Sequence, residues 1–348
     1  MADPDRFLTV ADFEAAAAAR MDAAAWDYYA GGAGNEHTIA DNRHAWDRIR
    51  LRPRVLVDVS ERNLSITVLG TRLAHPIVVA PTAAHGLAHE DAERATARGA
   101  AAADALYVLS TISTVPMETV AETPLGAPRW FQLYAPEDRT TCRDLVDRAV
   151  AAGYGGIVVT VDLPMPGNRE RDRRNRFTVP LGVHLPADQP TGETGLVVLP
   201  TWTWSDLEWL RSVCPIPLIA KGILRSDDAE RAFQAGCDGI WVSNHGGRQL
   251  DTSVTATAGL PEIADAVGGR TVIVADGGVR RGVDALKALA LGADLVAVGR
   301  PVLWGLAVSG AVGVARVLEI LRDELSLAMA LAGCRTLDEI TPDLLAST

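Results

Sequence analysis

Eight short apolar segments rich in β-branched residues lie between residues 76 and 300, and segments of helical character separate them. The apolar segments are PIVVAP (76–81), LYVLST (106–111), RWFQLY (129–134), GIVVTV (156–161), PLIAKG (217–222), GIWVSN (239–244), TVIVADG (271–277) and LVAVGR (295–300). Most are continuously apolar, which is typical of parallel strands covered on both faces. Eight strands alternating with helices predict an α/β fold, the TIM (β/α)8 barrel. An open doubly wound sheet would more often carry GxGxxG after its first strand, where this chain has APTAAHG.

Four of the intervening segments carry helix signals. Helices are expected at EDAERATARGAAAA (90–103), RTTCRDLVDRAVAAG (139–153), SDDAERAFQAG (226–236) and RRGVDALKALALG (280–292). Within 226–236, Ser226 is expected to cap the N-terminus of the helix and Gly236 to stop it.

Two regions fall outside the barrel pattern, and we expect all of residues 1–348 to form one domain. Residues 1–75 are predicted to hold one or two helices, the first opening at Thr9 with a T-x-x-D capping box. The Pro- and Gly-rich connection 177–204 follows the fourth strand; a loop of this length is usually a lid or disordered, and we expect an active-site lid. The barrel covers 76–300, and residues 301–348 are expected to be helical.

Composition limits the partners. The 348 residues are 48% apolar, enough for a large core, and carry a formal net charge of −11. Nucleic acid and anionic membranes require basic surfaces, so neither is expected, although a small anion could bind in a local basic pocket. The four cysteines form no CxxC pair, and we find neither a signal peptide nor an 18-residue apolar run. The C-terminal LLAST is not a peroxisomal address. A cytoplasmic location is therefore predicted.

Polar residues stand at the C-terminal end of every predicted strand. In this fold those ends form the active face. They carry Pro81, Thr82, Ser110, Thr111, Gln132, Tyr134, Thr160, Asp162, Lys221, Ser243, Asn244, His245, Asp276, Gly299 and Arg300. We therefore predict a shared functional site at this rim.

The last two strands indicate a phosphate site. ADGGVRRG (275–282) and VGRP (298–301) place glycines and the side chains of Arg280 and Arg300 after strands seven and eight. Barrels often bind phosphate there through backbone N–H groups, and arginines grip phosphate in a bidentate manner. The alternative is a tight DGG turn with solvated arginines.

Several motifs resemble those of a known family. They are SNHGGRQLD (243–251), DGGVRRG (276–282), FQLY (131–134), TVD (160–162), DYYAGGA (27–33) and GNRERDRRNRF (167–177). From about Asp12 to Gly333 the chain resembles the FMN-dependent L-2-hydroxy acid oxidases and dehydrogenases, which include glycolate, lactate and mandelate oxidases and lactate monooxygenase. AAHGLAH (83–89), GNRERD (167–172) and GIWVSNHG (239–246) are most similar to the lactate oxidase branch.

The resemblance implies roles for seven side chains in catalysis: His245, Asp162, Tyr134, Arg169, Arg248, Tyr28 and Lys221. His245 would be the base, and Asp162 would stabilise its imidazolium form. Arg169 and Arg248 would bind the substrate carboxylate, helped by the hydroxyl of Tyr28. The residue types suit this chemistry, since histidine titrates near neutral pH and arginine is a fork-shaped cation that matches a carboxylate.

The resemblance also implies FMN as the cofactor. Its binding residues would be Pro81, Thr82, Ala83, Ser110, Gln132, Thr160, Lys221, Ser243, Asp276, Gly277, Gly278, Arg280, Gly299 and Arg300. Tyr134 would hydrogen-bond the substrate, and Lys221 would offset the negative charge of the reduced ring at its N1–O2 side. The backbone of Thr82 and Ala83 would lie by N5, and Arg280 and Arg300 would hold the phosphate.

Two departures leave the substrate open. Ile112 stands where many relatives carry an aromatic residue over the substrate, and segment 177–204 is shorter than the lactate oxidase lid and has no tyrosine. A larger aliphatic or aromatic 2-hydroxy acid therefore remains an alternative to lactate.

The expected reaction is oxidation by O2 to the 2-keto acid and H2O2. The alternatives are a dehydrogenase that passes electrons to a quinone or carrier, a lactate monooxygenase-type decarboxylation, and a non-catalytic flavoprotein. Relatives assemble as tetramers or octamers, which implies a homo-oligomer, with a homotetramer expected.

Other residues receive plainer interpretations. His85 and His89 are four apart but lack a third ligand, so no metal is expected and both are assigned to loop packing by the flavin. Asp172, Arg173 and Arg174 are predicted to be a solvated charge run. The tryptophans at 202, 204 and 209 are expected to pack.

Overall fold

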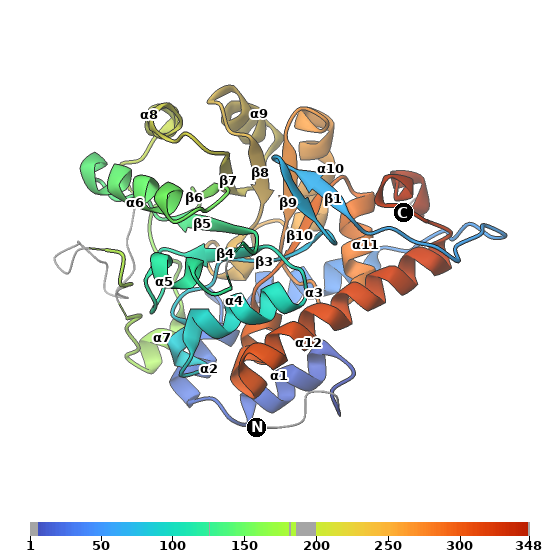
Figure 1. Cartoon of the computed structure of the whole chain (residues 1–348), viewed down its shortest axis with the longest axis horizontal. Coiled ribbons are helices and arrows are strands. Elements are labelled where there is room, and N and C mark those ends of the chain that lie inside the picture. The colour runs from blue at the N-terminus through green and yellow to red at the C-terminus, as the bar shows by residue number, and fades with distance from the viewer. Residues whose placement is uncertain (1–5, 125, 181, 186–199, 347–348) are drawn as a thin grey trace.

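The eight predicted strands pair edge to edge into a closed parallel barrel (Figure 1). The computed structural model describes residues 6–124, 126–180, 182–185 and 200–346. The barrel order is β10-β3-β4-β5-β6-β7-β8-β9. The strands are β3 (Ile77–Val79), β4 (Tyr107–Ser110), β5 (Arg129–Leu133), β6 (Ile157–Thr160), β7 (Leu218–Ile223), β8 (Gly239–Val242), β9 (Val272–Ala275) and β10 (Leu295–Val298). Each overlaps its predicted segment, so the α/β barrel prediction is confirmed.

Alternate residues of each strand fill the inside of the barrel. Val78, Val108, Trp130, Ile219 and Trp241 belong to one buried cluster, while their neighbours in sequence pack outward against the helices. This two-residue period follows from the pleat of a strand. A short antiparallel hairpin, β1 (Ile66–Val68) and β2 (Thr71–Leu73), adds Val68 and Leu73 to the inner cluster. The barrel is therefore a filled core, and only its C-terminal end carries polar inward positions.

Helices surround the barrel. They are α1 (Val10–Ala18), α2 (Ala23–Ala30), α3 (His37–Arg48), α4 (Ala92–Ala102), α5 (Met117–Ala121), α6 (Arg139–Ala151), α7 (Glu170–Arg174), α8 (Trp204–Val213), α9 (Ser226–Gln234), α10 (Ala256–Val267), α11 (Gly282–Ala290) and α12 (Arg300–Ala332). The four predicted inter-strand helices are present, and the Thr9–Asp12 capping box of α1 is confirmed.

Two local predictions were wrong. The described part of this region, residues 6–75, contains three α-helices and the hairpin rather than one or two helices. Ser226 is the first residue of α9, and Arg225 is the N-cap. The backbone N–H of Ser226 donates instead to Glu262 on α10, so a neighbouring carboxylate satisfies this helix end. Gly236 follows the helix with φ +89°, as a stop residue should.

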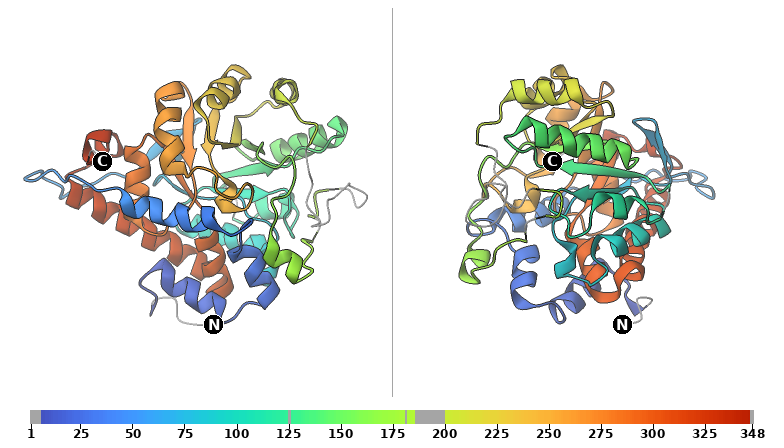
Figure 2. Two further views of the ribbon diagram at one scale, coloured as in Figure 1. Left: turned by 180° about the vertical axis from the view of Figure 1, so that it is seen from behind. Right: turned by 60° about the vertical axis from the view of Figure 1, so that its left-hand side comes forward.

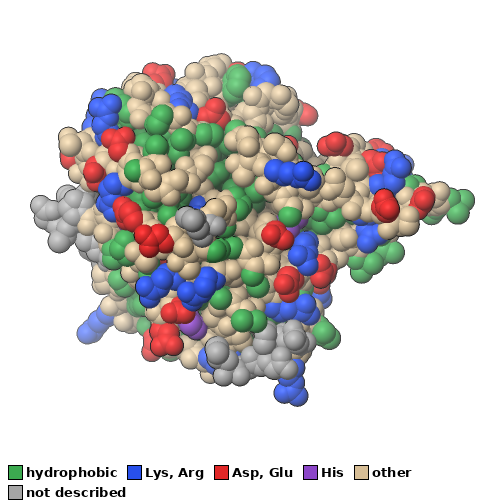
Figure 3. Space-filling model, in the orientation of Figure 1, with side chains coloured by type: hydrophobic (Ala, Val, Ile, Leu, Met, Phe, Trp, Pro, Cys, Tyr) green, Lys and Arg blue, Asp and Glu red, His purple; other side chains and the backbone are tan. Residues whose placement is uncertain are grey.

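The long C-terminal helix α12 lies against α1, α4 and α11, and Figure 2 shows it beside the N-terminal helices. Among the described helices it alone has the length and apolarity to cross a membrane. Most of that apolar stretch is buried inside the protein, as in a core helix of the barrel's outer layer. On the face seen in Figure 3, acidic and basic side chains are interspersed over the surface.

The N-terminal segment is fastened to the loops at the C-terminal end of the barrel. The indole N–H of Trp46 donates to the carbonyl of Gly277, and the amides of Asn42 and Asn244 exchange two hydrogen bonds. Asp251 accepts from the backbone N–H of Thr38. Residues 30–46 therefore form part of the rim rather than a separate extension. Most of the predicted lid, residues 186–199, lies outside the described residues.

Candidate active site

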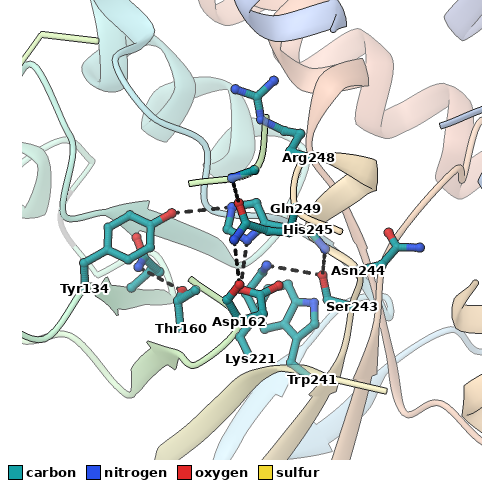
Figure 4. Close-up of polar contacts among 12 residues, drawn as sticks. Tyr134, Thr160, Asp162, Lys221, Trp241, Ser243, Asn244, His245, Arg248 and Gln249 are labelled. Carbon is teal, nitrogen blue, oxygen red and sulfur yellow. Dashed lines mark hydrogen bonds and ion pairs between the residues drawn. The ribbon is translucent and has the colours of Figure 1, made fainter. Parts of the chain in front are cut away.

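A hydrogen-bonded layer of polar side chains closes the top of the barrel core (Figure 4). Its members stand two residues beyond inward-facing apolar positions, so strand alternation points them into the barrel as well. Ser110 donates to the amide oxygen of Gln132, whose NH2 group donates to Thr160. Across the barrel, Lys221 donates to Ser243, and Ser243 donates to Asp276 over 2.7 Å. The layer is the floor of a cavity.

His245 and Asp162 form a close pair above this floor. Nδ1 of His245 lies 2.9 Å from Oδ1 of Asp162, and Nε2 lies 3.5 Å from the hydroxyl of Tyr134 (Figure 4). Burial lowers the pKa of His245 below its usual 6.5, and the charge of Asp162 opposes this only in part. Burial alone would raise the pKa of Asp162, but the charge and hydrogen bond of His245, with Lys221, lower it overall. The lowered pKa of His245 favours a neutral imidazole beside the carboxylate of Asp162, an arrangement that suits a general base.

Two arginines converge on the same cavity. Arg169 is 4% exposed, and its Nε donates to the carbonyl of Arg248. The guanidinium of Arg248 lies 4.7 Å from the ring centre of Tyr28 and donates to the backbone carbonyls of Tyr28 and Gly31. Burial, and then the charge of Arg248, lower the pKa of Arg169 to about 10. Two cations held in this way form a binding site for a carboxylate.

The opposite end of the cavity contains the glycine-arginine loops. An added Cβ at Gly278, where φ is +78°, would lie 2.0 Å from the carbonyl oxygen of Asn42, so only glycine fits under α3. Arg280 lies 3.7 Å from Glu14, and burial, followed by the charge of Arg43, lowers its pKa to about 10. This end can hold an anionic phosphate.

Arg300 is anchored differently from Arg280. Its guanidinium donates to the backbone carbonyls of Tyr29, Gly31 and Gly246 over 2.7–2.9 Å. It still lines the cavity, but its N–H groups are already directed at carbonyls. Arg280 is therefore the freer of the two predicted phosphate ligands.

The chain matches a known family model along almost its whole length. The model is described as FMN-dependent dehydrogenase and matches residues 17–347. This protein belongs to the FMN-dependent dehydrogenase family. It is 50% identical to an L-lactate oxidase from Nostoc sp., over 94% of this chain and 95% of that protein. It is 44% identical to the peroxisomal (S)-2-hydroxy-acid oxidase GLO4 of Oryza sativa subsp. japonica, covering 96% and 94%. The structure of mandelate oxidase with (S)-2-phenylpropionate superposes with a TM-score of 0.89 at 42% identity, covering 98% of each chain.

The cavity of this family member fits FMN, its cofactor. One continuous lining joins the arginine end to the base. It contains the predicted Tyr28, Pro81, Thr82, Ala83, Ser110, Tyr134, Arg169, Lys221, His245, Arg248, Asp276, Gly277, Gly278, Arg280, Gly299 and Arg300. Cations at one end, a lysine on the floor and a base above it match a phosphate, a flavin ring and a substrate in that order. The predicted Asp162, Gln132, Thr160 and Ser243 stand behind this lining and support it.

One residue, Asp172, lies elsewhere than predicted. Asp172 is 4% exposed rather than solvated, and burial raises its pKa, although Arg248 and Arg169 oppose the shift. It is the buried residue of α7 and feels the charges of Arg248 and Arg169, whereas Arg173 and Arg174 are exposed as expected. Ile112 is fully buried and is not among the residues that line the cavity, so its effect on the substrate side stays a prediction.

The packing assignments of His85 and of the three tryptophans are confirmed. The ring of His85 is buried between the hydroxyls of Thr82, at 2.6 Å, and Thr96, at 2.8 Å. No group of three potential metal ligands occurs within the described part of the chain. The tryptophans at 202, 204 and 209 are partly buried against the core.

Sequence reasoning missed two residues that hold the site's loops. Gln249 donates to the backbone carbonyls of Asp162 and Met165 and accepts from the N–H of Gly167. It therefore fixes the loop that carries both Asp162 and Arg169. The hydroxyl of Tyr29 donates to the carbonyl of Ala84 over 2.6 Å. Both could have been noticed from their places in the quoted motifs, Gln249 in SNHGGRQLD and Tyr29 in DYYAGGA.

Replacing Arg280 with methionine should weaken FMN binding by about 10- to 100-fold. A hydrogen bond to a charged group contributes about 1.5–3 kcal/mol, and methionine keeps much of the side chain's volume. Titration of apoprotein with FMN, followed by quenching of flavin fluorescence, measures the effect. Arg98→Met, which breaks the surface ion pair with Asp91, is the matched control. Unchanged affinity in Arg280→Met would show that the phosphate lies elsewhere.

Proposed function

We propose that this protein oxidises an (S)-2-hydroxy acid to the 2-keto acid with FMN, and that O2 accepts the electrons to give H2O2. The observation that carries the proposal is the pairing of His245 with Asp162, at 2.9 Å, beside a cavity that His245 lines together with Arg169 and Arg248. The lactate, (S)-2-hydroxy-acid and mandelate oxidases among its relatives support this reaction class.

Each side chain has a defined task in this reaction. Arg169 and Arg248 hold the substrate carboxylate, which orients the carbon that bears the hydroxyl group. Nε2 of His245 accepts the substrate proton, and the charge of Asp162 stabilises the imidazolium that forms. Bound FMN supplies the two-electron oxidation. Burial raises the pKa of Tyr134, so its hydroxyl stays protonated and able to donate a hydrogen bond to the substrate.

The location and assembly are further parts of the proposal. We infer a cytoplasmic protein, since all four cysteines are free thiols buried in the structure. A homotetramer, or an octamer of the same subunits, is proposed from the family resemblance alone. Light scattering of the FMN-loaded protein gives its mass, and a monomer would contradict this part.

The reaction is tested with a panel of 2-hydroxy acids, both enantiomers of each, added to the FMN-loaded protein without O2. Bleaching of the flavin by (S)-acids, with little by (R)-acids, is expected. If peroxide forms when O2 is admitted, the protein is an oxidase, and if CO2 forms, it is a monooxygenase. If neither product forms but a quinone is reduced, it is a dehydrogenase. The panel also identifies the side chain that the substrate carries. If no 2-hydroxy acid bleaches the flavin, the proposed function is wrong.

His245→Ala should keep FMN bound and slow flavin reduction by about 10²- to 10⁴-fold, the range that a positioned base contributes. The flavin spectrum before substrate addition is its control for folding. Rapid-mixing spectroscopy without O2 measures the reduction rate, and a rate like that of the unchanged protein would exclude His245 as the base.

Two pKa shifts predict the pH dependence of flavin reduction. The base acts as neutral imidazole, and its pKa is below 6.5, so the rate should be full at pH 7 and fall only at lower pH. The carboxylate site needs a charged Arg169, whose pKa is about 10, so KM should rise as the pH passes that value. The reduction rate, measured above and below pH 6.5, checks the first expectation. KM, measured above and below a pH of about 10, checks the second. A reduction rate that already falls on acidification at a pH above 6.5 would contradict the assignment of the buried His245 as the base.

A further inference from the structure

Strand β7 contains an irregularity directly after the lysine of the cavity floor. Lys221 is in register with Trp241 of β8, but the next pair is Ile223 with Val242, so Gly222 is an extra residue. Its φ of +112° lies in a region that residues with side chains rarely adopt. A bulge of this kind re-aims the strand next to a site. Here it turns the backbone of Gly222 toward the loop after β6.

The side chain of Asp162 occupies the space that a side chain at position 222 would need. A Cβ added at Gly222 would lie 2.5 Å from both Cβ and Cγ of Asp162, and 2.9 Å from Oδ2. Real Cβ atoms do not approach other atoms so closely. Any side chain at position 222 would therefore displace the carboxylate that His245 uses.

Few polar contacts fix the orientation of that carboxylate. Oδ1 faces Nδ1 of His245 at 2.9 Å, whereas Oδ2 is buried and makes no hydrogen bond within the described part of the chain. Gln249 holds the backbone carbonyl of Asp162, but it does not contact the carboxylate. The direction of the side chain is therefore set by packing, and Gly222 is the wall on one side.

Space for a displaced carboxylate exists beside the pair. A cleft of about 490 Å³ is lined by residues that include Asp162, Gly222, Pro164, Met165, Leu224 and Gln249. His245 does not line this cleft. A carboxylate moved into it would leave the imidazole without its charge partner, while the barrel itself would stay intact.

We propose that Gly222 is a positioning residue for the base: its missing side chain holds the Asp162 carboxylate against Nδ1 of His245. The proposal rests on the proposed function, because it acts through the proton acceptor of that reaction. Gly222 does not line the cavity that contains His245 and Lys221, so it acts through Asp162.

Gly222→Ala is expected to load FMN normally and to bind substrate with nearly unchanged KM, since Arg169 and Arg248 are untouched. Its flavin reduction should be about 100-fold slower, the scale of a displacement of about 1 Å. The fall of the reduction rate at low pH, its acid limb, should also move to lower pH, because His245 loses the charge of Asp162 that raises its pKa. Non-specific damage would reduce the amount of FMN-loaded protein without moving this limb. If this variant reduces the flavin at the rate of the unchanged protein and has the same acid limb, the proposal is wrong.

Gly153→Ala is the matched control. Gly153 also has positive φ, at +79°, but an added Cβ there meets nothing within 4 Å. It tests backbone strain alone, and its reduction rate should equal that of the unchanged protein. A loss like that of Gly222→Ala would assign the effect to strain and overturn the proposal.

A double-variant comparison tests whether Gly222 acts through Asp162. In an Asp162→Asn background, Gly222→Ala should cost little further rate, because coupled residues are non-additive. A full additional 100-fold loss would overturn the proposal. If Gly222→Ala alone fails to load FMN, adding Asp162→Gly removes the overlapping side chain and should restore loading; failure to restore it also overturns the proposal. The proposed function is judged separately, by bleaching of the unchanged protein with 2-hydroxy acids.

Discussion

Strand alternation is the constraint on which the rest of this structure depends. Because side chains point alternately in and out, the inward positions of each strand form one column that runs from the barrel core to its rim. Trp130 continues to Gln132, Ile219 to Lys221, and Trp241 to Ser243. The lower members exclude water, and the upper members pair with one another. A lysine that is 4% exposed is tolerated there because Ser243 accepts its hydrogen bond and Asp276 lies 3.8 Å away.

The N-terminal segment solves a problem that the barrel alone cannot. An acidic protein must hold several arginines in one buried cavity, and cations confined together repel one another. Helix α2 ends at the rim, where its last carbonyls lack intrahelical partners and carry partial negative charge. The carbonyls of Tyr28, Tyr29 and Gly31 accept from Arg248 and Arg300. A helix end thereby stabilises one arginine from the substrate side and one from the phosphate side.

The sequence predicted what depends on local pattern. Eight apolar segments that alternate with helices are compatible with few topologies. The rule that barrel sites lie at the C-terminal ends of strands then identified the rim residues from the sequence alone. What it missed depends on contacts between distant segments. Ser226 lost its cap role to Glu262, a residue of another helix. Asp172 stands in a charged stretch, and only the folded structure shows that it is the buried residue of α7, close enough to Arg248 and Arg169 to feel their charges. Gly222 carried no functional signal in the sequence, because its proposed role is to leave space for the carboxylate of Asp162, which lies in the loop after another strand.

The charge states in the site follow from one environment that acts on two groups with different ordinary pKa values. Burial lowers the pKa of His245 and of Arg169, since it disfavours the cationic form of each. The histidine starts near neutrality and becomes a free base, whereas the arginine starts so high that it stays charged. The same dry cavity thus yields an uncharged proton acceptor beside a cationic carboxylate site over the pH range between them. Asp162 sets the balance, because its charge must be close enough to stabilise the imidazolium after proton transfer, yet too weak to protonate the imidazole beforehand. A distance of 2.9 Å, held by packing on Gly222 rather than by a second hydrogen bond, meets both requirements.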